Sequence, residues 1–216
     1  MNTVLIKAYK EPKISRREVL RYAGAKESAE CSDLVESAIA EASGIFAYRV
    51  AFCECEISIN GDLVDFGSFS VKSAHLAKNL SGCTDAIIFG ATVGLSIDRL
   101  VAKYSSRTPS RALMLNALGA ERIEALCDTF CEDICAELDV KPRPRFSPGY
   151  GDLPLGTQRD IFTLLDLPKR LGITLTDTLL MSPTKSVTAI LPIGKKETCV
   201  ADGCNGCEKT DCQFRK

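Results

Sequence analysis

Residues 145–151 read Arg-Phe-Ser-Pro-Gly-Tyr-Gly, and the rest of the chain is organised around this loop. Pro148 fixes its own φ, and Gly149 can adopt a positive φ, so the two are predicted to form the centre of a type II turn. Such a turn directs backbone N–H and C=O groups outward, where a ligand can use them. Arg145 adds a planar guanidinium that suits a carboxylate, and Tyr150 adds an aromatic face and a hydroxyl. Without its sequence context, the segment of residues 145–151 also fits an ordinary surface turn.

The elements on either side of this loop are predicted from their hydrophobic periodicity. Residues 110–138 form the longest helical pattern, which Gly119 is expected to break or narrow. After the loop, a helix that Thr157 can cap carries apolar residues as far as Leu165. Two later segments alternate as strands do, residues 173–176 and 187–191. Together with the hairpin region around Asn60-Gly61, they are expected to build an antiparallel sheet.

The first 44 residues are predicted to hold a short strand at residues 4–6 and two helices. Ser15 and Glu18 have the spacing of a capping box, which begins a helix that Gly24 ends. A second helix, from about Ser32, has an apolar stripe at helical spacing. Both helices are interpreted as packing elements that carry no chemistry.

Strand patterns dominate the next part of the chain. Residues 45–59 suggest half-buried strands, Asn60-Gly61 is a strong hairpin signal, and residues 86–91 form a continuous apolar run suited to a buried strand. Cys53 and Cys55 are expected to face one side together, toward the core. Because helices and strands are segregated more than alternated, we predict an α+β fold: an antiparallel twisted sheet with flanking helices and a short Cys-rich C-terminal tail.

Composition excludes several classes of protein. The chain has 216 residues, 45% of them hydrophobic, and a formal net charge of −1, so nothing indicates a nucleic-acid-binding surface. It has no 18-residue apolar run and no leader pattern, so we expect neither a membrane span nor export. Its 11 cysteines favour a reducing cytoplasm with free thiols, metal ligands or both. His75 is the only histidine and is interpreted as a surface or capping residue.

A series of motifs resembles the activation domain of cobalamin-dependent methionine synthase. The motifs occur in the order Arg145-x-Ser147-Pro148-Gly149-Tyr150, Thr157-Gln158, Ile161–Leu165, Leu171–Asp177, Met181-Ser182-Pro183 and Ser186-Val187-Thr188. The close match runs from about residue 117 to residue 193, and the first hundred residues match loosely. We therefore expect residues 1–194 to form an activation-like domain, standing free of the larger enzyme, with residues 1–107 only loosely matched, and residues 195–216 to form the tail.

The resemblance implies that the chain binds S-adenosylmethionine and supports reductive remethylation of cob(II)alamin, as part of a methyltransferase system. The cobalamin is expected on a partner, a methionine synthase or another corrinoid protein, with a flavodoxin- or ferredoxin-type electron donor. By the same resemblance, Arg145 pairs with the methionyl carboxylate, Ser147 and Gly149 meet the adenine through their backbone, and Tyr150 lines the site.

Two positions leave alternatives open. Glu124 falls at a helix glutamate that contacts the cofactor in the family, but it also fits a solvated helix-face carboxylate. Leu191-Pro192 stand where the family has an aromatic pair, so Leu191 is expected to bind the cofactor only through its backbone. On the same helix as Glu124, three thiols are interpreted as metal ligands or, preferably, as small apolar fillers: Cys127, Cys131 and Cys135.

The tail contains four cysteines within fourteen residues, Cys199, Cys204, Cys207 and Cys212. Four thiolates can hold zinc or an iron–sulfur cluster, and so polar a segment is expected to need a metal in order to fold. An idle, disordered tail is the alternative. A cluster could deliver the electron for remethylation, whereas zinc would be a structural staple.

Two other functions also fit the sequence. The chain could be a non-catalytic docking module for a corrinoid protein, or a stand-alone methyltransferase for small molecules. The second of these ranks last, because no glycine-rich methyltransferase loop follows the first strand.

Overall fold

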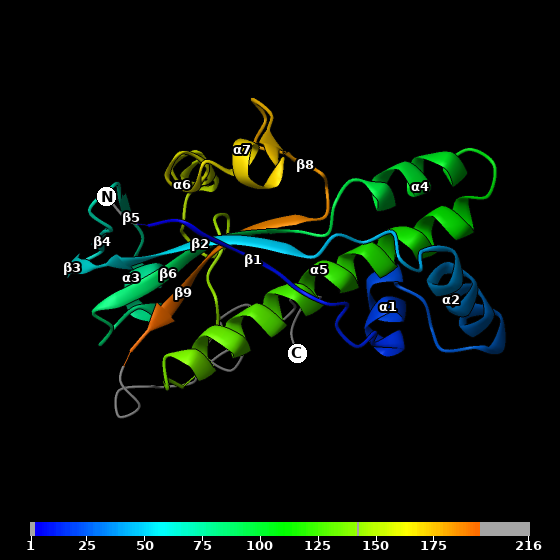
Figure 1. The fold of residues 1–216 in the computed structure, drawn as a ribbon, viewed down its shortest axis with the longest axis horizontal. Coiled ribbons are helices and arrows are strands. Elements are labelled where there is room, and N and C mark those ends of the chain that lie inside the picture. Colours follow the sequence, from blue (N-terminus) through cyan, green and yellow to red (C-terminus); the bar gives the residue numbers. More distant parts are fainter. Residues whose placement is uncertain (1–2, 142, 195–216) are drawn as a thin grey trace.

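The computed structural model describes residues 3–141 and 143–194 and has an α+β architecture (Figure 1). Its main sheet is antiparallel throughout, with strand order β1-β2-β6-β9. These strands are β1 (Leu5–Ala8), β2 (Arg49–Glu56), β6 (Asp85–Thr92) and β9 (Ser186–Ile193). The apolar run predicted at residues 86–91 lies within β6, which has a strand partner on both sides.

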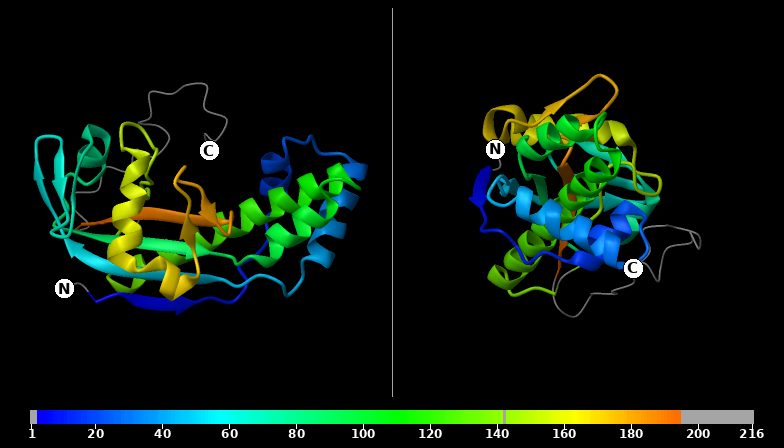
Figure 2. Two further views of the ribbon diagram at one scale, coloured as in Figure 1. Left: turned by 90° about the horizontal axis from the view of Figure 1, so that it is seen from above. Right: turned by 90° about the vertical axis from the view of Figure 1, so that its right-hand side faces the viewer.

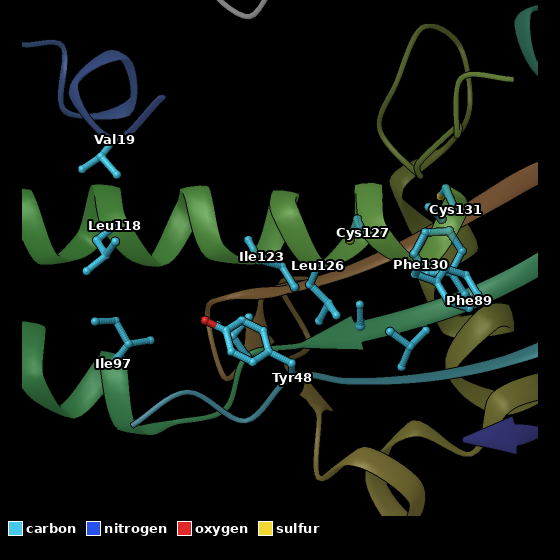
Figure 3. Close-up of a cluster of buried hydrophobic side chains, with 14 of the residues drawn as sticks. Val19, Tyr48, Phe89, Ile97, Leu118, Ile123, Leu126, Cys127, Phe130 and Cys131 are labelled. Atoms are coloured by element: carbon cyan, nitrogen blue, oxygen red, sulfur yellow. The ribbon is translucent and has the colours of Figure 1, made fainter. Parts of the chain in front are cut away.

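One face of the sheet is covered by the long helix α5 (Pro109–Glu137). The helices that pack on α5 are α1 (Arg16–Ala23), α2 (Ala29–Glu41) and α4 (Ser96–Tyr104). Phe130 of α5 lies at the centre of an aromatic cluster with Phe52 and Phe89 of the sheet. Figure 3 shows the side chains of α5 that fill the space above the strands, Cys127 and Cys131 among them. With Cys135 they are buried apolar residues, as the preferred interpretation expected.

The opposite face of the sheet carries a second core under α3 (Ala74–Asn79), α6 (Gln158–Leu165) and α7 (Leu167–Leu171). A 3₁₀ turn, Leu155–Thr157, precedes α6. Figures 1 and 2 show α6 and α7 on the side of the sheet away from α5. Cys53 and Cys55 of β2 both face this second core, with their sulfurs 3.7 Å apart, which confirms their predicted orientation.

The remaining strands form two small sheets and do not extend the main one. The strands β3 (Ser58–Asn60), β4 (Leu63–Asp65) and β5 (Ser70–Lys72) make a three-stranded meander, and β7 (Thr174–Leu175) pairs with β8 (Met181–Ser182). The hairpin at Asn60-Gly61 is confirmed. Of the region expected to build one sheet with β9, the strand β2 does lie in the main sheet, whereas β3, β4 and residues 173–176 do not. Distant strands pair according to the surfaces that they bury together. The alternation of apolar and polar residues along one strand does not show which strand is its partner.

Two glycines allow close packing of helices. A Cβ on Gly90 of β6 would lie 2.6 Å from Leu167 Cδ2, so α7 rests directly on the sheet backbone. Gly119 does not interrupt α5, contrary to one of the two expectations for it. A Cβ there would lie 3.1 Å from both Ile97 and Lys185, so this glycine narrows the helix where α4 and the loop before β9 approach it.

The first helices differ from the prediction in their caps. Ser15 caps α1, since its hydroxyl accepts a hydrogen bond from the Glu18 N–H at 3.4 Å. The reciprocal bond of a capping box is absent, because the Ser15 N–H donates to Glu121 of α5 at 2.9 Å. The cap of α2 is Ser28, four residues before Ser32. No helix among the described residues combines the length and apolar character needed to cross a bilayer.

Candidate functional site

The loop at residues 145–151 has the turn that the sequence predicted. The Tyr150 N–H donates to the Ser147 carbonyl at 3.0 Å, and Gly149 adopts a φ of 92°. The Gly149 N–H in turn donates to the Leu153 carbonyl at 2.9 Å. The loop is thereby closed on itself, with Gly149 and Tyr150 exposed at its tip.

Phe146 joins this loop to the edge of the main sheet. Its N–H and carbonyl exchange two 2.8 Å hydrogen bonds with Ile190 of β9. Its ring packs edge-on against Tyr150, with the centroids 6.0 Å apart. Tyr150 remains 55% exposed, so it offers an aromatic face to a ligand or a partner surface.

Arg145 and Glu124, both predicted as site residues, are in direct contact. One terminal nitrogen of Arg145 donates to Glu124 Oε2 at 2.5 Å, and the other donates to Asp128 Oδ1 at 2.5 Å. The Arg145 side chain is 18% exposed, while those of Glu124 and Asp128 are 35% and 43% exposed. The long helix α5 positions both carboxylates, because residues four apart lie on one helical face.

Electrostatics at this cluster follow from its burial. Burial alone would lower the pKa of Arg145, but Cys127, Glu124 and Asp128 nearby raise that pKa above its ordinary value. Burial also raises the pKa of Cys127, and it raises the pKa of Cys131 to about 12 despite the nearby arginine. These thiols are therefore protonated and unreactive at neutral pH, whereas the guanidinium is fully charged.

A groove of about 590 Å³ runs between α1 and α5 and includes the carboxylates that pair with Arg145. Its lining residues are Pro12, Lys13, Ser15, Arg17, Glu18, Arg21, Tyr22, Glu121, Glu124, Ala125, Asp128, Thr129 and Glu132. The α5 wall is acidic and the α1 wall carries several cations. The sequence predicts only a packing role for α1, yet this helix also forms one wall of the groove.

The charges of the α1 wall are only partly used within the protein. Arg21 pairs with Glu18 at 2.7 Å and lies over the Tyr22 ring, 4.2 Å from its centroid. Burial, together with the charge of Glu124, raises the pKa of Tyr22. Arg17 forms no ion pair with any residue that the structure describes, so its charge faces the groove unpaired.

A buried ion pair fixes the end of the groove. Arg122 is fully buried and donates to both carboxylate oxygens of its neighbour Glu121, at 2.5 and 2.6 Å. The same guanidinium donates to the backbone carbonyls of Pro12 and Lys13 at 2.5 and 2.9 Å. This pair ties the segment before α1 to α5, a contact that no local sequence pattern indicates.

The other predicted site residues lie elsewhere. Leu191 is fully buried on β9, and its side chain packs into the core under α5, so it cannot reach a ligand in the groove. His75 is exposed on α3, 3.7 Å from Asp152, as a surface or capping residue should be. Cys199, Cys204, Cys207 and Cys212 lie outside the described residues. Within residues 3–141 and 143–194, no group of three or more His, Cys, Asp or Glu side chains is placed to hold a metal ion.

Asp128 is the residue at this site that the sequence analysis missed. A signal was available, because Asp128 follows Glu124 by four residues and must share its helix face. What the spacing could not show is that Arg145, 17 residues later, folds back onto both of them. Together they place a guanidinium and two carboxylates beside a groove, an arrangement suited to a ligand that carries charges of both signs.

Comparisons with known proteins bear on the fold and on one part of the sequence. Residues 143–198 match the family model described as vitamin B12 dependent methionine synthase, activation domain. A crystal structure of the MetH reactivation domain bound to AdoHcy superposes with a TM-score of 0.68 at 15% sequence identity, covering 91% of this chain and 80% of that one. No curated protein sequence matches the chain. The chain therefore has the fold of the methionine synthase reactivation domain, and over residues 143–198 it carries the sequence pattern of the B12-dependent methionine synthase activation-domain family.

Proposed function

We propose that this chain binds S-adenosylmethionine at the loop of residues 145–151, here called the Arg145 loop. In this proposal it supports reductive remethylation of a cobalamin that is carried by a partner methionine synthase or other corrinoid protein. Two findings support the proposal: the sequence match to the activation domain, and a shared fold with a reactivation domain bound to AdoHcy. The observation that carries it is the contact of Arg145 with Glu124 and Asp128 at the edge of the groove.

The residues present fit the charges of this cofactor. S-adenosylmethionine has a carboxylate, an ammonium group and a sulfonium. The planar fork of Arg145 suits the carboxylate, and Glu124 suits the cationic groups. The groove of about 590 Å³ falls in the range of small-molecule sites.

The loop would hold the adenine. The backbone groups of Ser147 and Gly149 stand at the turn, next to the exposed ring of Tyr150. Leu191 could take part only through its backbone, since its side chain is buried.

The contribution of the chain to the reaction is then mainly positioning. When bound, S-adenosylmethionine supplies an electrophilic methyl group on sulfur. Arg145 fixes one end of the molecule and the loop fixes the other, so that this methyl group faces the docked partner in one orientation. Such restriction of two reacting groups can supply a large share of a rate enhancement, while the corrin carries the difficult chemistry.

Titration calorimetry of S-adenosylmethionine with the wild type and Arg145→Ala tests the site. Loss of a charge-assisted pair to the ligand carboxylate is expected to cost about 1.5–3 kcal/mol, or roughly ten- to a hundredfold in affinity. Arg99→Ala is the matched control, since Arg99 is an exposed arginine on α4 and lies outside the groove lining. Equal affinities for wild type and Arg145→Ala would exclude Arg145 from the site.

A second candidate function, a docking module without cofactor binding, is favoured by one observation. The aromatic pair that the resemblance leads us to expect is replaced by Leu191-Pro192, and the Leu191 side chain is directed into the core. This candidate predicts that the wild type binds a corrinoid protein but shows no heat of binding with S-adenosylmethionine.

Two further parts of the proposal rest on the cysteines. No disulfide joins the seven cysteines within the described ranges, which supports a reducing, cytoplasmic setting. The tail cysteines are proposed to hold zinc or an iron–sulfur cluster. If they hold a cluster, it would supply the electron that a flavodoxin- or ferredoxin-type donor provides otherwise.

A further inference from the structure

The guanidinium proposed to receive the ligand carboxylate is already engaged by the protein. Each terminal nitrogen of Arg145 donates to a different carboxylate of α5, one to Glu124 and one to Asp128. A guanidinium binds a ligand carboxylate best through two parallel hydrogen bonds from adjacent nitrogens. A ligand carboxylate that approaches Arg145 in this way therefore competes with both internal partners for the N–H donors and the charge of the guanidinium, and it binds best if one of them is displaced.

Asp128 is the partner more easily displaced. Its side chain is 43% exposed, against 35% for Glu124, so water can solvate the released carboxylate more readily. It is one turn further along α5 and has the shorter side chain, so it cannot follow the guanidinium if the guanidinium moves. Glu124 by contrast is expected to stay in the site as a partner for the cationic groups of the ligand.

We propose that Asp128 determines the affinity of this site by competing with the ligand carboxylate for Arg145. The inference rests on the proposed function, because it assumes that a carboxylate ligand uses Arg145. It predicts that removal of the Asp128 carboxylate, which lies in the groove and contacts Arg145, tightens binding of the ligand. It also sets a selectivity: only ligands that carry a carboxylate have to compete.

Two chemically matched variants separate this competition from a general charge effect. Asp128→Asn and Glu132→Gln each remove one negative charge from the α5 side of the groove. Of these two residues, Asp128 is bonded to Arg145, whereas Glu132 has no ion pair within the described part of the chain. A general gain in attraction for anions would appear in both variants, and relief of competition would appear in Asp128→Asn alone.

The probes are AdoHcy and 5′-methylthioadenosine, which keeps the adenosine thioether but lacks the amino-acid group. We expect Asp128→Asn to bind AdoHcy roughly two- to fivefold more tightly than the wild type, the range for relief of a half-exposed ion pair. Glu132→Gln is expected to match the wild type. Neither variant should alter the affinity for 5′-methylthioadenosine. Asp128→Ala serves as a second variant, because it removes the carboxylate without leaving an amide beside Arg145, and it should give the same gain.

The outcomes of this experiment are distinguishable. Binding of AdoHcy by the wild type, with equal or weaker binding by both Asp128 variants, would overturn the inference and leave the proposed function standing. Equal gains in Asp128→Asn and Glu132→Gln would also overturn it, since the effect would then be general. No binding of AdoHcy by any of the proteins would overturn the proposed function and the inference together.

Discussion

The acidic residues of α5 have two different roles, which depend on how exposed they are. Glu124 and Asp128 are partly exposed and hold Arg145 at the edge of the groove. Glu121, three residues before Glu124, is buried with Arg122 and fixes the segment that leads into α1. Exposure is what separates these roles, because a buried charge must keep its partner whereas a partly exposed one can exchange its partner with a ligand.

At the residue scale, Glu121→Ala is predicted to destabilise the protein strongly. The substitution leaves the fully buried Arg122 guanidinium without its carboxylate and removes the acceptor of the Ser15 N–H. Breaking one half of a buried ion pair costs about 3–5 kcal/mol of unfolding free energy. Urea unfolding followed by circular dichroism measures this cost. The exposed Glu132→Ala on the same helix should change the unfolding free energy by less than about 0.5 kcal/mol. Similar losses in both variants would show that the buried pair contributes nothing special.

Elements are held to the main sheet from both sides. On one side, α5 packs its apolar residues, including three cysteines, against β2, β6 and β9. On the other side, α7 approaches so closely that Gly90 of β6 has no room for a side chain. The position of α7 matters for the site, because α6 and α7 follow directly after the Arg145 loop in the chain.

At the element scale, Gly90→Ala is predicted to cost about 1–3 kcal/mol of unfolding free energy, the range for overpacking a core. The new methyl group would meet Leu167 Cδ2 at 2.6 Å. Leu167→Ala alone should cost about 2–5 kcal/mol, because it leaves a cavity. The double variant should cost clearly less than the sum of the two, since the methyl group then occupies the space that Leu167 leaves.

Gly156→Ala is the control for the glycine substitution, because a Cβ there meets no atom within 4 Å. It should leave the unfolding free energy nearly unchanged. Strict additivity of the Gly90 and Leu167 costs in denaturant unfolding would contradict the close approach of α7 to β6.

The whole molecule extends from the meander β3–β5 and α3 at one end to α2 and α4 at the other (Figure 1). At the α2 end, Glu41 joins three helices. It accepts a 2.6 Å hydrogen bond from the Tyr104 hydroxyl of α4 and a 2.7 Å bond from Arg111 of α5. The Tyr104 hydrogen bond, together with the Arg111 charge, lowers the pKa of Glu41 below its ordinary value of 4.5.

The lowered pKa of Glu41 predicts how the stability of the folded protein depends on pH. A carboxyl with a lower pKa in the folded state contributes stability above pH 4.5, and loses it as the pH falls through the folded value. We therefore expect Glu41→Gln to be less stable than the wild type at neutral pH, and the difference to shrink as the solution is acidified below pH 4.5. Urea unfolding at several pH values measures it, with Glu27→Gln as an exposed control. A difference that stays constant with pH would contradict the assignment to Glu41.

The metal proposed for the tail is tested on the full chain. Anaerobically purified protein is expected to contain either one zinc ion or an iron–sulfur cluster with visible absorption, held by Cys199, Cys204, Cys207 and Cys212. Cys204→Ser with Cys207→Ser should abolish it, whereas Cys31→Ser, which changes a thiol on α2, should not. Stoichiometric metal in the double variant, or no metal in the wild type, would refute a metal-binding tail.

Much of the local structure could be predicted because local patterns encode it. The α5 helix, the β6 strand, the Asn60-Gly61 hairpin and the turn at Gly149 all depend on neighbouring residues, and each was found where the sequence placed it. The α+β class and the resemblance to the activation domain also followed from the sequence.

Tertiary structure alone decided which strands pair, which wall of the groove α1 forms, and which side chains meet Arg145. These contacts join segments far apart in the chain, and their free energy depends on the surfaces buried together rather than on any local pattern. The sequence by itself therefore determined the elements and the residue types of the site. Only folding determined that Arg145 lies against Glu124 and Asp128, because a charged side chain takes its partner from whatever the fold brings within reach.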